Sequence, residues 1–156
     1  MNNTFLKCIP SVYIPVKNLE KSSQWWIGNF NLEFVVPLKP ESEQAILKLG
    51  DGQWLHLVKT RGDQTTNFIS QKDGVEYDMF SLTFEVREIE KLYQRCVKNG
   101  VKIEGLELRK GCGINFRFYD PDGNKYDVNE NIYMHRTEFE IEKVLNEMFV
   151  SNTIEV

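Results

Sequence analysis

Hydrophobic and polar residues alternate in two stretches of this chain, and the second stretch nearly repeats the first. In residues 11–16 the hydrophobic positions are Val12, Ile14 and Val16. Residues 81–87 read Ser-Leu-Thr-Phe-Glu-Val-Arg and place hydrophobic side chains at the same alternate positions. A period of two residues predicts a β-strand that buries one face. The repeat therefore predicts two copies of one supersecondary unit.

In the first copy, the strand is followed by a helical pattern and then by further strands. Asn18 is a favourable N-cap residue for the helix. A glycine-rich turn near the end of the first copy predicts a hairpin. The expected elements are a helix from Asn18 to Gly28 or Asn29, a strand over residues 32–37, and strands over 45–49 and 54–59 around Gly50-Asp51-Gly52.

The second copy repeats this order. We expect a strand over residues 80–86, a helix over 88–99 that ends at Gly100, a strand over 101–108, a turn at 111–113, and a hairpin of strands 114–119 and 125–130. Between the copies, residues 60–78 are polar and show no sustained period, which predicts a linker or a lid. After the copies, residues 138–149 have helical spacing of hydrophobic residues and predict one amphipathic helix.

These elements predict an α+β fold of two βαβββ modules. Two half-domains would each bury an apolar face that neither could bury alone, so function is expected between them. We predict one domain over residues 1–131, made of modules 8–60 and 79–131. Residues 132–156 form a C-terminal helical extension, which docks either on the domain or on a partner subunit.

Composition excludes several classes of protein. The net charge of −4 over 156 residues provides no basic surface for a nucleic-acid backbone. No apolar run approaches the roughly 20 residues that cross a bilayer, and the first residues do not form a leader, so we expect a cytoplasmic protein and no membrane partner. The three cysteines, Cys8, Cys96 and Cys112, lack metal-type spacing and are typical of reduced thiols.

The strand residues that point away from the helices form a mixed aromatic and polar face. Such a face is typical of a small-molecule site, although in an ordinary antiparallel sheet it would simply be solvated. Three large rings favour the site, because open solvated faces rarely collect them. The residues of this face are Ser11, Tyr13, Trp54, His56, Ser81, Thr83, Glu85, Asn115, Arg117, Tyr119, Asp127 and Asn129.

Two of these residues are candidates for acid-base chemistry and one for anion binding. His56 and Asp127 could act as general base or acid, although His56 lies between two leucines and could equally be a wall residue. Arg117 could clamp a carboxylate or phosphate, or it could pair with Glu85 or Asp127.

The chain resembles the vicinal oxygen chelate superfamily in three features. These are the order of its elements, the sequence Val-Lys-Asn-Leu-Glu-Lys-Ser at residues 16–22, and the sequence Phe-Tyr-Asp-Pro-Asp-Gly-Asn at residues 118–124. This group includes glyoxalase I, extradiol dioxygenases, and fosfomycin- and bleomycin-resistance proteins. The resemblance spans roughly residues 8–131, and it implies that the two modules curl into a mixed sheet around a central pocket. It also implies a homodimer, for which the C-terminal helix is a further indication.

In the metal-using members, four side chains of the pocket, usually His or Glu, bind the metal. By motif, these positions are Ser11, His56, Ser81 and Asp127 in this chain. Because a serine hydroxyl is a poor ligand for divalent ions, we expect no metal or other cofactor.

The predicted function is metal-free binding of a small, partly aromatic or anionic molecule. Its contacts would be Ser11, Tyr13, Trp54, His56, Ser81, Arg117, Tyr119 and Asp127. The alternative is a metal-dependent lyase, isomerase or dioxygenase of the glyoxalase type that uses His56 and Asp127 as catalytic residues. A third possibility is a regulatory or structural dimer with a vestigial pocket.

Overall fold

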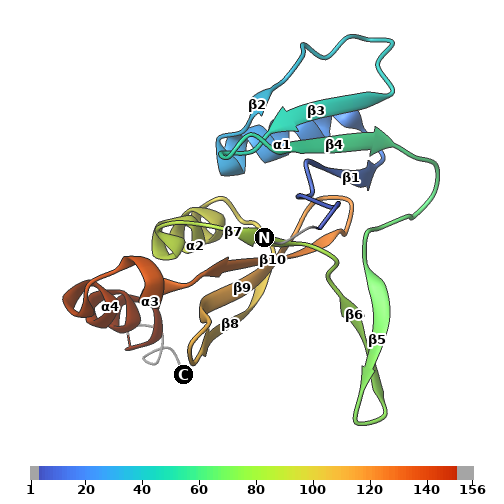
Figure 1. Cartoon of the computed structure of the whole chain (residues 1–156). Helices are drawn as coiled ribbons and strands as arrows, with labels where there is room; N and C mark the ends of the chain where they lie inside the picture. Colours follow the sequence, from blue (N-terminus) through green and yellow to red (C-terminus); the bar gives the residue numbers. More distant parts are fainter. Residues whose placement is uncertain (1–3, 151–156) are drawn as a thin grey trace. The chain divides into compact units, whose positions relative to one another are not determined.

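A computed structural model describes residues 4–150, which divide into two compact units. One unit holds the chain up to Thr66 together with Pro121–Asn124, and the other holds Asn67–Asp120 and the chain from Lys125 onward. Each unit contains the predicted βαβββ order of elements (Figure 1). The α+β fold class with curled mixed sheets and a C-terminal helix is thereby confirmed.

The first unit is a four-stranded sheet with one helix on its face (Figure 1). The strand order is β1-β4-β3-β2, and β1 runs parallel to β4. Buried residues alternate in β1 and β3 as predicted, whereas in β4 His56 is buried together with Leu55 and Leu57. Trp26 of the helix is buried as well. The elements are β1 (Ser11–Val16), α1 (Leu19–Phe30), β2 (Glu33–Phe34), β3 (Gln44–Lys48) and β4 (Trp54–Lys59).

Helix α1 begins where the sequence predicts and ends later. The Asn18 side chain accepts a hydrogen bond from the Lys21 backbone N–H at 2.9 Å, which confirms the N-cap. The expected end at Gly28 or Asn29 is wrong, because a helix interior tolerates glycine at a cost of about 1 kcal/mol. The helix instead ends at Phe30, and the C-cap residue Asn31 has a left-handed φ of 55° that lets its N–H reach the Ile27 carbonyl oxygen.

The strand expected over residues 32–37 is also shorter. Only Glu33–Phe34 form β2, and the Val35 N–H adds one bond to the Ile46 carbonyl oxygen at 2.8 Å. Pro37 has no N–H with which to continue the ladder.

The segment Pro121–Asn124 fixes the loop that enters helix α1. The Asp122 carboxylate accepts hydrogen bonds from the Lys17 N–H and the Ser22 hydroxyl, both at 2.8 Å. The Asn124 amide donates to the Pro15 carbonyl oxygen at 3.0 Å and accepts from the Thr66 N–H at 2.9 Å. These four bonds give the Asp-Pro-Asp-Gly-Asn sequence a structural role in the first unit.

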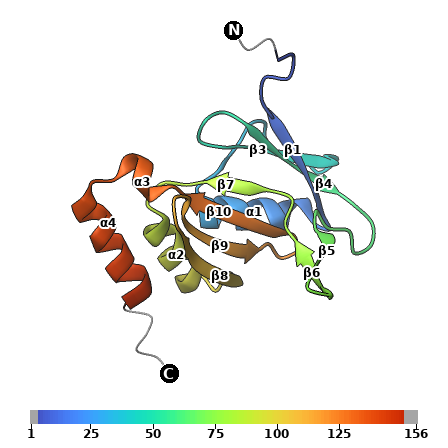
Figure 2. The same ribbon diagram turned by 60° about the horizontal axis from the view of Figure 1, so that its bottom comes forward.

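The second unit repeats the arrangement. Its four-stranded sheet has the order β7-β10-β9-β8, with β7 parallel to β10. Helix α2 covers one face (Figure 2), and Tyr93 of that helix packs edge-on against Phe116 at 5.3 Å between ring centroids. The expected strand over 80–86 is reduced to three residues. The elements are β7 (Thr83–Glu85), α2 (Ile89–Lys98), β8 (Ile103–Arg109), β9 (Gly113–Tyr119) and β10 (Lys125–Glu130).

Residues 60–78, for which the sequence predicts a linker or a lid, include regular structure that the lack of a sustained period did not indicate. This region contains a β-hairpin of β5 (Phe68–Lys72) and β6 (Val75–Met79), which is separate from both four-stranded sheets. Its turn is Asp73-Gly74, with φ angles of 53° and 80°. Asp-Gly between alternating residues is a strong hairpin signal, because both central residues of this turn need positive φ.

The C-terminal residues form three short helical segments: α3 (Ile132–His135), α4 (Glu138–Leu145) and a π-helical turn over Asn146–Val150. Thr137 and Glu140 form a capping box at the start of α4. Helix α4 lies beside α2 of the same unit (Figures 1 and 2), and its Val144 is buried. Of the two predicted alternatives, the structure shows docking on the chain's own domain.

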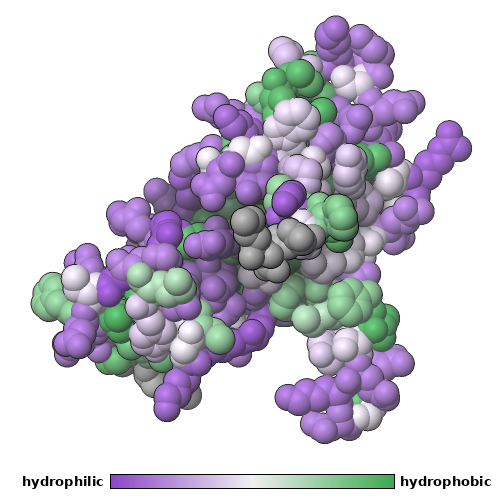
Figure 3. Space-filling view, viewed as in Figure 1, coloured by the Kyte–Doolittle hydropathy of each residue, from purple (hydrophilic) through white to green (hydrophobic). Residues whose placement is uncertain are grey.

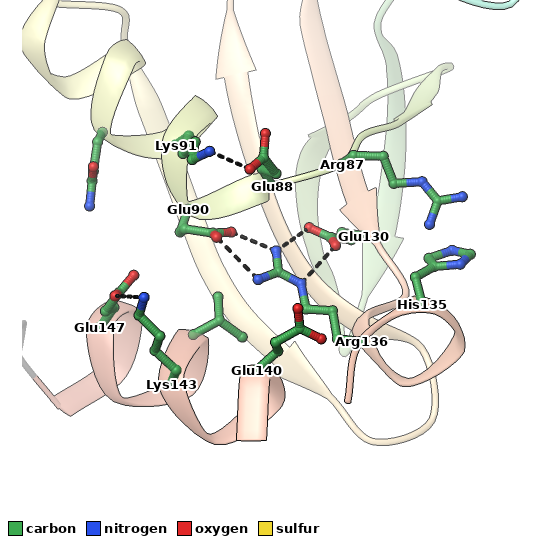
Figure 4. A pocket seen from close by; sticks show the side chains of 12 residues that line it. Arg87, Glu88, Glu90, Lys91, Glu130, His135, Arg136, Glu140, Lys143 and Glu147 are labelled. Carbon is green, nitrogen blue, oxygen red and sulfur yellow. Dashed lines mark hydrogen bonds and ion pairs between the residues drawn. The ribbon is translucent and has the colours of Figure 1, made fainter. Parts of the chain in front are cut away.

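Arg136 holds this C-terminal segment to the rest of the second unit (Figure 4). Its guanidinium donates to Glu130 of β10 at 2.9 and 2.8 Å and to Glu90 of α2 at 3.1 and 2.6 Å. Glu130 also accepts from the Ile89 N–H at 2.8 Å. Burial opposes ionisation of Glu90, but the bonds from Arg136 outweigh it and hold the Glu90 pKa below its usual range.

No helix in residues 4–150 is both long and apolar enough to cross a membrane. Cys8, Cys96 and Cys112 are free thiols, and burial raises the pKa of Cys96 to about 11.

We predict that Arg136→Met lowers the free energy of unfolding of the second unit by about 3–5 kcal/mol at neutral pH, because the buried Glu130 and the partly buried Glu90 lose their partner. Urea denaturation measures this. The difference in unfolding free energy between parent and variant should shrink below pH 4.5, the ordinary pKa of Glu90. A carboxylate whose pKa is lowered in the folded protein loses its stabilising contribution as it becomes protonated.

The matched control is Lys143→Gln. Lys143 lies 3.9 Å from Glu147 in an exposed pair, so its loss should cost less than about 0.5 kcal/mol. Equal effects of the two variants would contradict the proposed role of Arg136.

Candidate functional site

Three of the predicted site residues form a ring cluster in the first unit. The parallel register of β1 and β4 pairs Tyr13 with His56 and Ser11 with Trp54. The Tyr13 and His56 rings are stacked, with centroids 4.5 Å apart and planes 25° apart. Trp54 is tilted against His56 at 6.1 Å. The structure therefore joins Tyr13, Trp54 and His56 into one aromatic surface.

His56 is held in one orientation by Gln44 of β3. The His56 Nδ1 lies 3.0 Å from the Gln44 Oε1. An amide oxygen accepts a hydrogen bond, so Nδ1 carries the proton in the neutral imidazole and Nε2 carries the lone pair. Nε2 is buried and makes no hydrogen bond with the described residues. His56 thus presents an unused acceptor within the first unit.

Asp127 is the corresponding residue of the second unit. It is the third residue of β10, as His56 is of β4, and the register places it beside Thr83 of β7. Its Oδ2 accepts hydrogen bonds from the Thr83 hydroxyl at 3.1 Å and the Asn115 amide at 3.3 Å. Burial raises the pKa of Asp127, and the Thr83 bond and the Arg117 charge oppose that rise.

Arg117 is surrounded by acceptors of its own unit. Its Nε lies 3.4 Å from Asp127 Oδ1, Nη1 donates to the Gly105 carbonyl oxygen at 3.1 Å, and Nη2 donates to Glu107 at 2.6 Å. Of the two pairings that the sequence left open, the one with Asp127 is present, whereas Glu85 pairs with Arg87 at 3.7 Å.

A β-bulge shapes this cluster. The register of β8 shifts between Glu104 and Glu107, and Gly105 within the shift has a positive φ of 65°. A Cβ atom at residue 105 would lie 2.4 Å from Arg117 Nη1. Glycine is therefore needed both for the backbone conformation and for the close approach of the guanidinium.

Tyr119 belongs to a neighbouring group of charges rather than to the Asp127 cluster. Its hydroxyl donates to Glu104 at 3.1 Å, and Glu104 also pairs with Lys125 at 2.7 Å. The Lys102 ammonium lies 4.2 Å from the centroid of the Tyr119 ring. This ring face is already in contact with a cation.

The two predicted serine positions contribute little to these clusters. Ser11 is half-buried opposite Trp54, and Ser81 is exposed and lies two residues before the start of β7. Within residues 4–150, no group of three or more His, Cys, Asp or Glu side chains is placed to hold a metal ion. The donor set of neither unit, taken alone, fits a divalent metal centre.

Sequence reasoning missed Gln44, Gly105 and Glu107. Gln44 is two positions along β3 from Ile46, the partner of His56, so only a known register reveals the contact. The bulge breaks the two-residue period of β8, and the side of the sheet on which Glu107 lies cannot be inferred from alternation.

A separate groove of about 600 Å³ lies between α2 and the C-terminal helices (Figure 4). It is lined by Arg136 and its carboxylate partners and by further charged residues, among them Lys91 and Lys143. None of the predicted site residues lines it. The Arg136 guanidinium in this groove is hydrogen-bonded to Glu90 and Glu130, so the groove belongs to the structural network described above.

Comparison with known proteins agrees with this fold. Over 130 residues the chain is 27% identical to the uncharacterized protein YetH of Bacillus subtilis. This alignment covers 80% of this chain and 99% of YetH. The structure is similar to that of TnmS3, an antibiotic binding protein from Streptomyces sp. CB03234. The TM-score is 0.63 at 14% identity, with 83% of this chain and 99% of TnmS3 covered.

It is also similar to the fosfomycin resistance protein FosX from Listeria monocytogenes in complex with Mn(II) and sulfate. The TM-score is 0.62 at 18% identity, with 90% of this chain and 98% of FosX covered. At these identities, the structural matches show the fold alone. The family model described as Glyoxalase/Bleomycin resistance protein/Dioxygenase superfamily matches residues 8–128, and the chain belongs to this family.

Proposed function

We propose that this protein binds a small, partly aromatic molecule without the help of a metal ion. The observation that carries the proposal is the ring cluster of the first unit. Tyr13 is 63% exposed and Trp54 42% exposed, although both contact the buried His56 ring. Large exposed rings on the polar face of a sheet provide stacking surfaces for a planar ligand.

The charges of the second unit support binding without a metal. The Arg117 guanidinium lies 3.4 Å from Asp127 Oδ1, the carboxylate at a family ligand position. That guanidinium supplies the single positive charge that this carboxylate balances, and Ser81 supplies no second negative charge, whereas a stable divalent site needs three or four strong ligands. TnmS3, whose fold is similar, is described as an antibiotic binding protein, and binding of this kind is what we propose for this chain.

One observation favours the alternative, a metal-dependent lyase, isomerase or dioxygenase that uses His56 and Asp127. Gln44 fixes the Nδ1 side of His56 and leaves the Nε2 lone pair unused. Metal-binding histidines are commonly oriented by such a bond to their other nitrogen. FosX, with a similar fold, is described as a complex with Mn(II).

We also propose a homodimer in which hairpin β5–β6 contributes to the interface. Cross-strand pairing places Phe68, Tyr77, Val75 and Met79 on one face, and the first three are exposed. Figure 3 shows hydrophobic residues on the part of the hairpin away from its tip. A lone two-stranded hairpin is marginally stable in water, and a second copy would cover this face.

We predict that Trp54→Ala weakens binding of 2-naphthol by about tenfold, because a stacking contact and its buried area are worth together about 1.4 kcal/mol. Isothermal titration calorimetry measures the affinity without relying on tryptophan fluorescence. Tyr133→Ala, which removes an exposed ring of α3, is the control and should leave the affinity unchanged. Equal effects of the two variants would contradict the ring cluster as the binding surface.

Elemental analysis separates the proposed function from its alternative. We expect less than about 0.1 Zn, Ni, Mn or Fe per chain after purification and incubation with each metal, because a stable site needs three or four strong ligands. About one metal per chain that is lost in His56→Ala would refute metal-free binding and favour the enzyme.

Sedimentation equilibrium at tens of micromolar protein tests the dimer. We expect twice the chain mass, and Val75→Lys should shift the equilibrium toward monomer by about tenfold or more because it buries a charge in the interface. Ile69→Lys is the matched control, since Ile69 is exposed on the opposite face of the hairpin. A monomeric parent protein would overturn the assembly.

A further inference from the structure

The second unit holds a buried acceptor that has no hydrogen-bond donor among the residues the structure describes. Asp127 is only 3% exposed, and its Oδ1 makes no hydrogen bond within the described part of the chain. Arg117 Nε is within ion-pair distance of this oxygen at 3.4 Å, but the contact lacks the geometry of a hydrogen bond. A buried acceptor without a donor costs about 1–3 kcal/mol, so its persistence calls for a specific explanation.

The carboxylate is held so that this one oxygen stays available. Thr83 and Asn115 both donate to Oδ2, from the two strands that flank β10. Their bonds orient the carboxylate and leave Oδ1 with both of its lone pairs. The arrangement resembles His56 of the first unit, where Gln44 binds one nitrogen and the other stays unused.

Among the described residues, the cation that pairs with Asp127 is Arg117, and other acceptors already engage it. Arg117 donates to the Gly105 carbonyl oxygen and to Glu107, and Glu107 also accepts from Arg109 at 3.0 Å. Two guanidinium groups therefore face two carboxylates, Glu107 and Asp127, and the local charge is balanced. An anionic ligand would have to displace Glu107 before it reached Arg117.

We propose that the ligand of this protein carries a cationic N–H donor, such as an amidine, guanidine or amine attached to a planar ring, and that this donor binds Asp127 Oδ1. The inference rests on the proposed small-molecule function and specifies its ligand class. It replaces the expected anion contact at Arg117. The donor takes the place of Arg117 Nε, and the Phe80 ring, 5.7 Å from the guanidinium carbon, provides adjacent aromatic surface.

Two probes with the same ring distinguish the ligand classes. 2-Naphthamidine is a cationic donor at neutral pH, and 2-naphthoate is an anionic acceptor. In calorimetric titrations with chelator present, the amidine should bind about tenfold more tightly or better, as a charge-assisted hydrogen bond predicts. Tighter binding of naphthoate would overturn this inference and leave the proposed function intact. If neither probe binds, the proposed function fails, and this inference fails with it.

Two variants test the residues. Asp127→Asn should weaken amidine binding by about tenfold or more and should not weaken naphthoate binding, because only the donor's ionic partner is lost. Asp51→Asn, in an exposed turn of the first unit, is the control and should change neither affinity. Equal amidine affinities of a folded Asp127→Asn protein and the parent would refute the contact.

Glu107→Gln tests the inference even if Asp127→Asn does not fold, because Glu107 is 39% exposed and outside the core. Removing its charge releases Arg117, so naphthoate affinity should rise by about fivefold or more while the amidine still binds. An unchanged naphthoate affinity would show that Glu107 does not keep anions from Arg117, and would contradict the inference.

Discussion

Parallel pairing of the first and last strands of each βαβββ unit is the constraint on which the rest of this structure depends. β1 pairs with β4, and β7 pairs with β10. Parallel neighbours require a long crossover, and here the crossover is the helix together with the two intervening strands. The same pairing places Tyr13 beside His56 and Thr83 beside Asp127. Each candidate functional group is thus positioned by the interaction that builds its sheet.

The second unit contains two clusters of arginine and carboxylate side chains, one around Arg136 and one around Arg117, that differ in how completely their charges are paired. Arg136 makes four hydrogen bonds to Glu90 and Glu130, and burial of these charges is compensated by complete pairing. Asp127 is less completely compensated, because one of its oxygens has no hydrogen-bond donor within residues 4–150 and burial raises its pKa. Full pairing is typical of structural networks, whereas a buried group left unpaired marks a candidate site.

Membership of the family does not by itself decide between binding and catalysis, since one scaffold hosts many activities. The decision depends on the side chains at the strand positions that face away from the helices. In this chain, those positions provide a ring cluster in one unit and a carboxylate held beside a guanidinium in the other. Our proposal of a planar ligand with hydrogen-bond donors rests on these two features.

The sequence by itself determined the repeat, the order of strands and helices within it, and the division of strand residues between two faces. These follow from local periodicity and from capping and turn residues such as Asn18, because they depend on neighbours along the chain. Residues that act through cross-strand neighbours were not accessible in this way. Gln44 reaches His56 only through the register of β3 and β4, and Glu107 reaches Arg117 only because a bulge shifts the register of β8. Tertiary structure alone decided that Arg117 is engaged by carboxylates, because that contact joins residues from three strands whose relative positions no local pattern records.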